Sequence, residues 1–126
     1  MADVVYSMKV EPEAVYSEEK SDVASDVYVF QYRIRITNLG SVPAQLISRH
    51  WIITDANDQV QEVRGIGVIG EQPRIEPGQS FEYSSGTSLK TPYGSMRGLY
   101  HMQADDGTRF EAAIPEMVLV ARRVLH

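Results

Sequence analysis

Hydrophobic and polar residues alternate along much of the chain. The clearest example is the segment VYVFQYRIRIT, in which aromatic and isoleucine side chains occupy every second position: Tyr28, Phe30, Tyr32, Ile34 and Ile36. Because successive side chains of a strand point to opposite faces, this pattern predicts a long strand with one buried face. Turn-forming residues at 38–41 end the pattern and predict the end of the strand.

The same alternation, together with enrichment in β-branched and aromatic residues, predicts further strands. We expect them at residues 44–55, 59–64, 80–84, 96–104, 109–114 and 117–121. Turns separate them at 55–58, 76–79 and 105–108, and the Asp-Asp-Gly-Thr sequence of the last turn is a strong hairpin signal. Pro115 is expected to end the strand before it, because proline cannot donate a ladder hydrogen bond.

The first segment of the chain is less regular. Residues 4–16 alternate between polar and apolar side chains, but Pro12 lies among them. We therefore predict an edge strand that is broken at Pro12. The acidic and polar residues 18–25 predict a surface loop.

These patterns together indicate the fold class. Along the whole sequence, no segment repeats apolar residues at the spacing of about 3.6 residues that marks an amphipathic helix. Many short strands with frequent turns are typical of two packed antiparallel sheets. We predict one domain over residues 1–126, an all-β, immunoglobulin-like or fibronectin type III-like antiparallel β-sandwich with Trp51 and Met102 in its core.

Composition and charge narrow the range of functions. The 126 residues carry a formal net charge of −5 and a pI of about 5.1, which disfavours binding to nucleic acids or anionic membranes. The sequence has no cysteine, so disulfides and thiolate sites are excluded. The acidic N-terminal stretch is unlike a secretory signal, and the apolar runs are too short to span a bilayer. We expect a cytoplasmic protein that binds neither nucleic acid nor membrane.

The stretch GIGVIG at residues 65–70 fits the pattern G-x-G-x-x-G. A dinucleotide site needs these glycines to open a helix, but Pro73 and Pro77 follow too closely for a helix to persist. Two interpretations stay open. The backbone amides could form a nest for an anion, with Arg64 and Arg74 beside it. More simply, the glycines could supply positive φ angles or a bulge in the connection between two strands.

Catalytic residues are few and scattered. Ser84, Ser85 and Thr87 surround a glycine but lack the spacing of an exposed nucleophile motif. Glu71 lies in the glycine stretch and could act as a general base. No motif combines a nucleophile, a base and an orienting group, so we predict a protein without enzymatic activity and without a cofactor. The alternative is a weak phosphate-anhydride hydrolase that uses Glu71 or a histidine.

Metal-binding residues are sparse as well. The histidines are His50, His101 and His126, and strand alternation places the first two away from the predicted core. The residues at 55–58 resemble part of a calcium loop but lack its glycine and its bidentate glutamate. We predict no metal site, and a direct sensor of divalent metals is a further alternative.

The sequence resembles the ApaG family, also called CorD in connection with cobalt and magnesium resistance. The resemblance rests on RHWIITDANDQVQEV, GIGVIGEQPRIEPGQSFEYSSGTSL and TPYGSMRGLYHM, followed by the Asp-Asp-Gly-Thr turn. It implies a fibronectin-like or immunoglobulin-like sandwich that serves as an interaction module in larger proteins. It also implies an indirect link of the stand-alone form to divalent-cation efflux and diadenosine tetraphosphate metabolism, without established catalytic residues.

The resemblance further implies that Gly65, Gly67 and Gly70 form a pyrophosphate-contacting loop. With the neighbouring Arg64 and Glu71, these glycines are our candidate anion-binding residues. We therefore predict a binding or regulatory module whose ligand is pyrophosphate, a nucleotide or an unidentified protein partner. A homodimer through an edge strand is a further option, since exposed edges can recruit a second strand.

Overall fold

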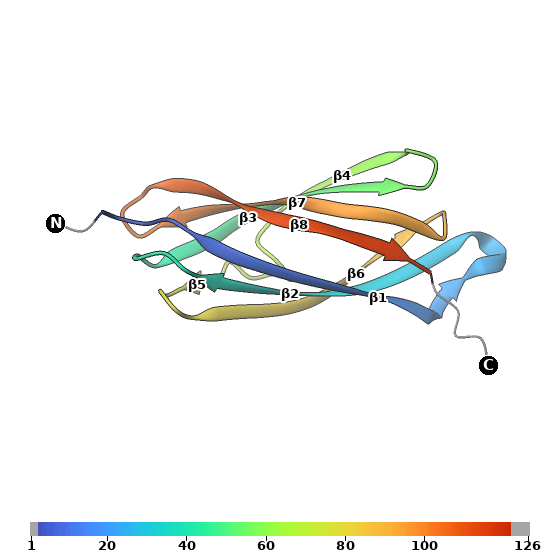
Figure 1. Ribbon diagram of the computed structural model, residues 1–126, viewed down its shortest axis with the longest axis horizontal. Helices are drawn as coiled ribbons and strands as arrows, with labels where there is room; N and C mark the ends of the chain where they lie inside the picture. The colour runs from blue at the N-terminus through green and yellow to red at the C-terminus, as the bar shows by residue number, and fades with distance from the viewer. Residues whose placement is uncertain (1–2, 122–126) are drawn as a thin grey trace.

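The computed structural model describes residues 3–121, which form two packed antiparallel sheets (Figure 1). One sheet has the strand order β1-β2-β6, and the other has the order β4-β3-β7-β8 with β5 paired to β3. The elements are β1 (Met8–Asp22), the 3-10 turn η1 (Val23–Ser25), β2 (Val27–Asn38), β3 (Ala44–Asp55), β4 (Val60–Ile66), β5 (Arg74–Ile75), β6 (Ser80–Leu89), β7 (Tyr93–Ala104) and β8 (Arg109–Val120). This arrangement confirms the predicted β-sandwich. Within the described residues, no helix is long and apolar enough to cross a membrane.

The alternating apolar side chains of the strands form the core between the two sheets. Phe30, Tyr32, Trp51, Tyr100 and Met102 are all buried, as their positions predict. Tyr32 of one sheet meets Trp51 of the other edge-on, with ring centroids 5.6 Å apart, and Trp51 meets Tyr100 at 6.5 Å. Burial of each large apolar side chain contributes about 1.5–3 kcal/mol, so these aromatic contacts help to hold the two sheets together.

The prediction of a strand break at Pro12 is wrong. β1 is continuous, and Pro12 pairs with Ile34 of β2. β1 is an edge strand, as predicted, and an edge proline is tolerated where its missing N–H faces away from the neighbouring strand. The loop predicted at 18–25 is also largely strand, because β1 extends to Asp22 through a register shift after Ser17.

Pro115 does not end a strand either, contrary to the prediction. β8 continues past it, and the pairing with β7 shifts register between Ile114 and Met117. A bulge on an edge strand accommodates a residue that cannot donate to the ladder. β6 is also longer than predicted and ends at Leu89, since its serines and threonine pair with β2 along the whole strand.

The two long sides of the sandwich differ. On one side β1 packs beside β8, so that the edges of both sheets cover each other (Figure 1). On the opposite side the edge strands are β4 and β6, and a cleft opens between the sheets there. The connection from β4 to β5, which contains the glycine stretch, contributes Val68, Ile69 and Gly70 to the wall of this cleft.

Candidate functional site in the cleft between the sheets

The glycine stretch forms a tight turn at the end of β4. The amide of Val68 donates to the carbonyl of Glu71 at 2.8 Å, and the amide of Glu71 donates back at 2.9 Å. Ile69 and Gly70 between them have φ angles of 45° and 78°, as in a type I′ turn. The amide of Gly67 donates to Ile47 at 2.8 Å. The amides of Gly67, Val68 and Glu71 are thus bonded within the protein, whereas those of Ile69 and Gly70 at the tip have no partner among residues 3–121.

Two of the glycines leave no room for a side chain. A Cβ on Gly67 would lie 2.2 Å from the carbonyl oxygen of Glu71, and its φ of +64° is itself unfavourable for other residues. A Cβ on Gly65 would lie 2.7 Å from Cζ of Arg49. Gly65 therefore allows the Arg49 side chain to cross β4. The turn geometry accounts for Gly67 and Gly70 without reference to a ligand.

Arg49 of β3 is held against the glycine stretch. One guanidinium nitrogen, Nη1, donates to the carbonyls of Gly67 at 2.7 Å and Ile66 at 3.3 Å. Arg49 is two residues before Trp51 and lines the cleft with it. Within the described part of the chain, no carboxylate forms an ion pair with Arg49. The bonds from Nη1 leave the other N–H groups of the fork without a side-chain acceptor.

The cleft beside Arg49 has a volume of about 380 Å³ and is formed by both sheets and the glycine stretch. Its lining is Tyr32, Arg49, Trp51, Ile53, Val63, Ile66, Val68, Ile69, Gly70, Tyr83, Ser85, Gly86, Thr87 and Met96. These residues include hydroxyl and guanidinium donors but no aspartate, glutamate or histidine. More of the cleft surface is polar than apolar, and it carries several hydrogen-bond donors, a composition that suits an acceptor-bearing ligand.

Three buried polar groups lie in this region. The indole nitrogen Nε1 of Trp51 is buried and has no hydrogen-bond partner among the described residues. The hydroxyls of Tyr83 and Tyr100 share a hydrogen bond of 2.5 Å. Burial raises the pKa of both tyrosines well above their usual value, so both hydroxyls stay protonated and neutral at physiological pH.

The predicted anion-binding residues do not all face one site. Gly65 lies in β4 and Gly67 and Gly70 lie in or beside the turn, but Arg64 lies on the outer face of its sheet because the preceding Val63 faces the core. Glu71 is exposed in the turn. The cation that adjoins the glycines on the cleft side is instead Arg49, which the sequence analysis missed.

Arg74, the second arginine near the stretch, is engaged elsewhere. Its guanidinium forms ion pairs with Glu76 at 2.7 Å and with Asp105. These carboxylates raise the pKa of Arg74, and the hydrogen bond from Arg74 lowers the pKa of Asp105. Arg74 is therefore occupied by two carboxylates at the far end of the loop.

The histidines lie on the outer face of the β4-β3-β7-β8 sheet. His50 and His101 line one shallow hollow together with Arg64. His50 Nε2 is 3.1 Å from Oε1 of Glu62. In the described residues no group of three or more histidine, aspartate and glutamate side chains is placed to hold a metal ion, and His126 lies outside those residues.

The other predicted residues have local roles. The Asp55 carboxylate accepts hydrogen bonds from the amides of Asn57 at 2.8 Å and Gln59 at 3.0 Å and so closes its own turn. Ser85 and Thr87 line the cleft from β6. One signal could have identified Arg49: strand alternation places it on the same face as Trp51, two positions earlier.

Comparison with known proteins reveals clear relatives. A family model described as the ApaG domain matches residues 18–104. Protein ApaG of Chromobacterium violaceum is 71% identical over 126 residues, which is 100% of both chains. Protein ApaG of Dechloromonas aromatica is 57% identical over 121 residues, which cover 96% of this chain and 95% of that protein. A crystal structure of a Bordetella pertussis protein described as ApaA has a TM-score of 0.91 and 52% identity, with 95% of this chain and 98% of that chain covered.

Proposed function

Because the chain belongs to the ApaG family, we propose that it is a binding module without catalytic activity, which holds the anionic group of its ligand in the cleft beside Arg49. The observation that carries this proposal is the guanidinium of Arg49, which lies in a donor-rich cleft and forms no ion pair with a carboxylate of residues 3–121. An arginine fixed in place by carbonyl groups is well suited to bind a phosphate or a carboxylate, because little side-chain freedom is lost on binding.

The surroundings of Arg49 support an anionic ligand. Ile69 and Gly70 at the tip of the turn line the same cleft, and their amides, which have no partner among residues 3–121, would add two further donors. Successive amides near a cation attract an oxyanion such as pyrophosphate. In this proposal the glycine stretch supplies part of the site, as the family resemblance implies, while Arg49 takes the place that the sequence analysis gave to Arg64.

The composition of the cleft favours binding over reaction. A hydrolase needs a base or a nucleophile within hydrogen-bond reach of the substrate. The raised pKa of Tyr83 keeps its hydroxyl protonated, so it is not available as a base, and the imidazoles of His50 and His101 belong to the other face of their sheet. Glu71 does not line the cleft. We therefore propose that a phosphate anhydride bound in the cleft is released without being hydrolysed.

Any contribution to cobalt and magnesium homeostasis is then indirect. The histidines and carboxylates of the described residues form no three-ligand cluster, and tight binding of a first-row metal needs such a cluster. We propose that the protein acts in the cytoplasm, which its cysteine-free sequence fits, and affects cation handling through its ligand or a protein partner.

The proposal is tested by titrating the protein with pyrophosphate and following the fluorescence of Trp51, which is the sole tryptophan of the chain and lines the cleft. We expect a saturable change. Arg49→Met should weaken binding at least about tenfold, since a hydrogen bond to a charged group contributes about 1.5–3 kcal/mol. Arg49→Lys should retain part of the affinity.

Arg64→Met is the matched control, because it removes the same charge from the outer face of the same sheet. We expect its affinity to equal that of the wild type. Loss of binding in Arg64→Met with retention in Arg49→Met would move the site to the shallow hollow lined by Arg64, His50 and His101. Release of phosphate during the titration would contradict the non-enzymatic proposal.

A further inference from the structure

On the open side of the sandwich, the second half of the β6 edge is less protected than the β4 edge. β1 carries Pro12 and several charges, and β8 carries Pro115 and two glutamates. β4 carries one glutamate and one arginine. In contrast, the second half of β6, SSGTS at residues 84–88, contains neither a charge nor a proline. Protein edges normally carry such features to prevent pairing with other strands, so their absence here marks an edge that is suited to receive one.

The backbone of β6 can accept another strand. β6 pairs with β2 from Ser80 to Leu89, and it is the last strand of its sheet. In an antiparallel ladder, every second residue directs its N–H and C=O away from the paired strand. Among residues 3–121, no other strand pairs with this side of β6. A row of alternating donors and acceptors is therefore free for an added strand.

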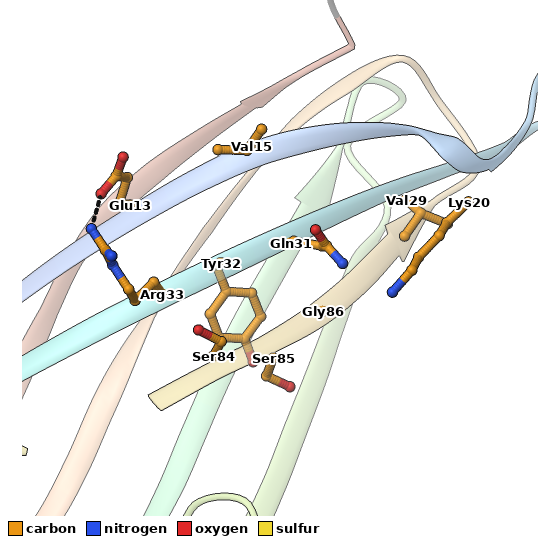
Figure 2. A pocket seen from close by; sticks show the side chains of 10 residues that line it. All are labelled: Glu13, Val15, Lys20, Val29, Gln31, Tyr32, Arg33, Ser84, Ser85 and Gly86. Atoms are coloured by element: carbon orange, nitrogen blue, oxygen red, sulfur yellow. Dashed lines mark hydrogen bonds and ion pairs between the residues drawn. The ribbon is translucent and has the colours of Figure 1, made fainter. Parts of the chain in front are cut away.

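A second hollow lies on the outer face of the same sheet, next to this edge. Figure 2 shows it between β1, β2 and β6, with Val15, Gln31 and Lys20 among its lining side chains. Its volume is about 610 Å³. Val15 pairs with Gln31, which in turn pairs with Gly86, so the hollow follows one row across the sheet to the β6 edge.

The outer hollow and the cleft meet at this edge. Both are lined by Ser85 and Gly86, and Tyr32 contributes to both. Gly86 has no side chain, so the row from Val15 to the edge is open at its end. Side chains of an added strand would alternate between the two faces, with one set reaching the outer hollow and the other set reaching the cleft.

Charge indicates the chemistry of the added strand. Lys20 at the outer hollow and Arg49 in the cleft form no ion pair with a carboxylate in the described residues. Arg33, which also lines the outer hollow, is already paired with Glu13 at 3.0 Å. One unpaired cation on each side of the edge suits a strand that has acidic side chains on both faces.

We propose that β6 binds an extended segment of a protein partner, with acidic and apolar residues, as a fourth strand of the β1-β2-β6 sheet. This inference rests on the proposed function, because an acidic side chain of the segment would supply the anionic group at Arg49. The main-chain ladder supplies affinity, and the two hollows supply specificity.

The test uses a phage-displayed library of random peptides, selected on the full-length protein. We expect enriched peptides with acidic residues and without a central proline. One such peptide, synthesised and bound, should slow hydrogen exchange at every second amide of residues 81–89 by at least about tenfold, because these amides become hydrogen-bonded. Gly86→Val places a side chain where the two hollows meet and should weaken peptide binding at least about tenfold.

The control is Ser88→Val, which adds a similar side chain to the same strand away from the junction and should bind normally. A Cβ on Gly86 would lie 3.3 Å from the Phe30 carbonyl oxygen, so Gly86→Val can lower the melting temperature of the protein. If it does, the smaller Gly86→Ala variant is used in its place. No enrichment, equal binding by Gly86→Val, or unchanged exchange in β6 would overturn the proposal. If the hydrogen-exchange protection of β6 rises with protein concentration in the absence of peptide, the proposal is overturned and the strand that pairs with β6 belongs to a second copy of the protein.

Two variants separate this proposal from the anion site. Lys20→Met changes the outer hollow but not the cleft, so it should bind pyrophosphate like the wild type and the acidic peptide more weakly, whereas Arg49→Met should weaken binding of both ligands. If pyrophosphate binds through Arg49 but no peptide is enriched, the anion site stands and the strand proposal fails. If peptides bind at β6 and Arg49→Met has no effect on either ligand, the anion site fails.

Discussion

Alanine substitutions at Gly65 and Gly67 add the same methyl group two residues apart, and the structure predicts different consequences. At Gly67 the methyl group would lie 2.2 Å from the backbone oxygen of Glu71, in a residue whose φ is +64°. The left-handed conformation costs a non-glycine residue about 1–2 kcal/mol. Relief of the clash also disturbs the two hydrogen bonds between Val68 and Glu71, at about 0.5–1.5 kcal/mol each. We expect Gly67→Ala to lose about 3 kcal/mol of stability.

At Gly65 the obstacle is the end of a flexible side chain. The methyl group would lie 2.7 Å from Cζ of Arg49, so the guanidinium must move away from the Ile66 and Gly67 carbonyls. Loss of these bonds costs about 1.5–3 kcal/mol, and replacing a strand glycine by alanine recovers about 0.5–1 kcal/mol. Gly65→Ala should therefore lose only about 1–2 kcal/mol of stability. It should nevertheless lose pyrophosphate affinity, because Arg49 is displaced.

Both effects are measured in one experiment per variant. Urea unfolding followed by Trp51 fluorescence gives the free energy of unfolding, and pyrophosphate titration of the folded protein gives the affinity. Gly107→Ala is the control for backbone strain alone, since Gly107 has a φ of +87° and an added methyl group there would meet no atom within 4 Å. Equal destabilisation of Gly65→Ala and Gly67→Ala, or full pyrophosphate affinity in Gly65→Ala, would refute the role assigned to Arg49.

Three further predictions concern stability. Ile69 has a φ of 45° and an exposed side chain, so Ile69→Gly should raise the free energy of unfolding by about 1 kcal/mol, and a lower melting temperature would contradict the strain. Tyr83→Phe leaves the buried Tyr100 hydroxyl without its partner and should cost about 1–3 kcal/mol in urea unfolding, whereas the double Phe variant should cost less than the sum of the single variants. The hydrogen bond from Arg74 lowers the folded-state pKa of Asp105, so the stability that this pair contributes is present above the ordinary pKa of an aspartate and is lost as the pH falls through the folded-state pKa. In Arg74→Met the free energy of unfolding should therefore fall less steeply as the pH is lowered. An unchanged pH dependence would contradict a stabilising role of the pair.

The sequence predicts a strand or a turn correctly where residues close together in the chain determine its conformation. Alternation alone locates β2 and β3, because each strand has one face in the core and one face toward solvent. The Asp-Asp-Gly-Thr hairpin is also local: Gly107 takes the positive φ, and the Ala104 amide donates to Thr108 at 2.8 Å. In both cases the residues that determine the conformation are close together in the chain.

The misplaced strand ends depend on tertiary position instead. Whether a proline breaks a strand depends on which neighbours that strand has, and the sequence does not show that Pro12 and Pro115 both lie on edge strands. The acidic segment at 18–22 looks like a loop because its side chains are polar, yet it continues the hairpin with β2.

The identity of the cation beside the glycines also depends on long-range pairing. Proximity in the sequence favours Arg64, but alternation turns its side chain away from the cleft. Arg49 reaches the stretch because β3 and β4 pair with Arg49 opposite Gly65. That register is set by the hairpin between the two strands, and short-range sequence patterns do not specify it to the residue.

The central claim, that the cleft holds an anionic group at Arg49, is tested most directly by NMR titration with pyrophosphate, with signals assigned for the backbone amides and the Trp51 indole N–H. The account predicts saturable shifts of the Trp51 indole and of the Ile69 and Gly70 amides, which disappear in Arg49→Met. Shifts confined to His50, Arg64 and His101, or no saturable shifts at all, would contradict it.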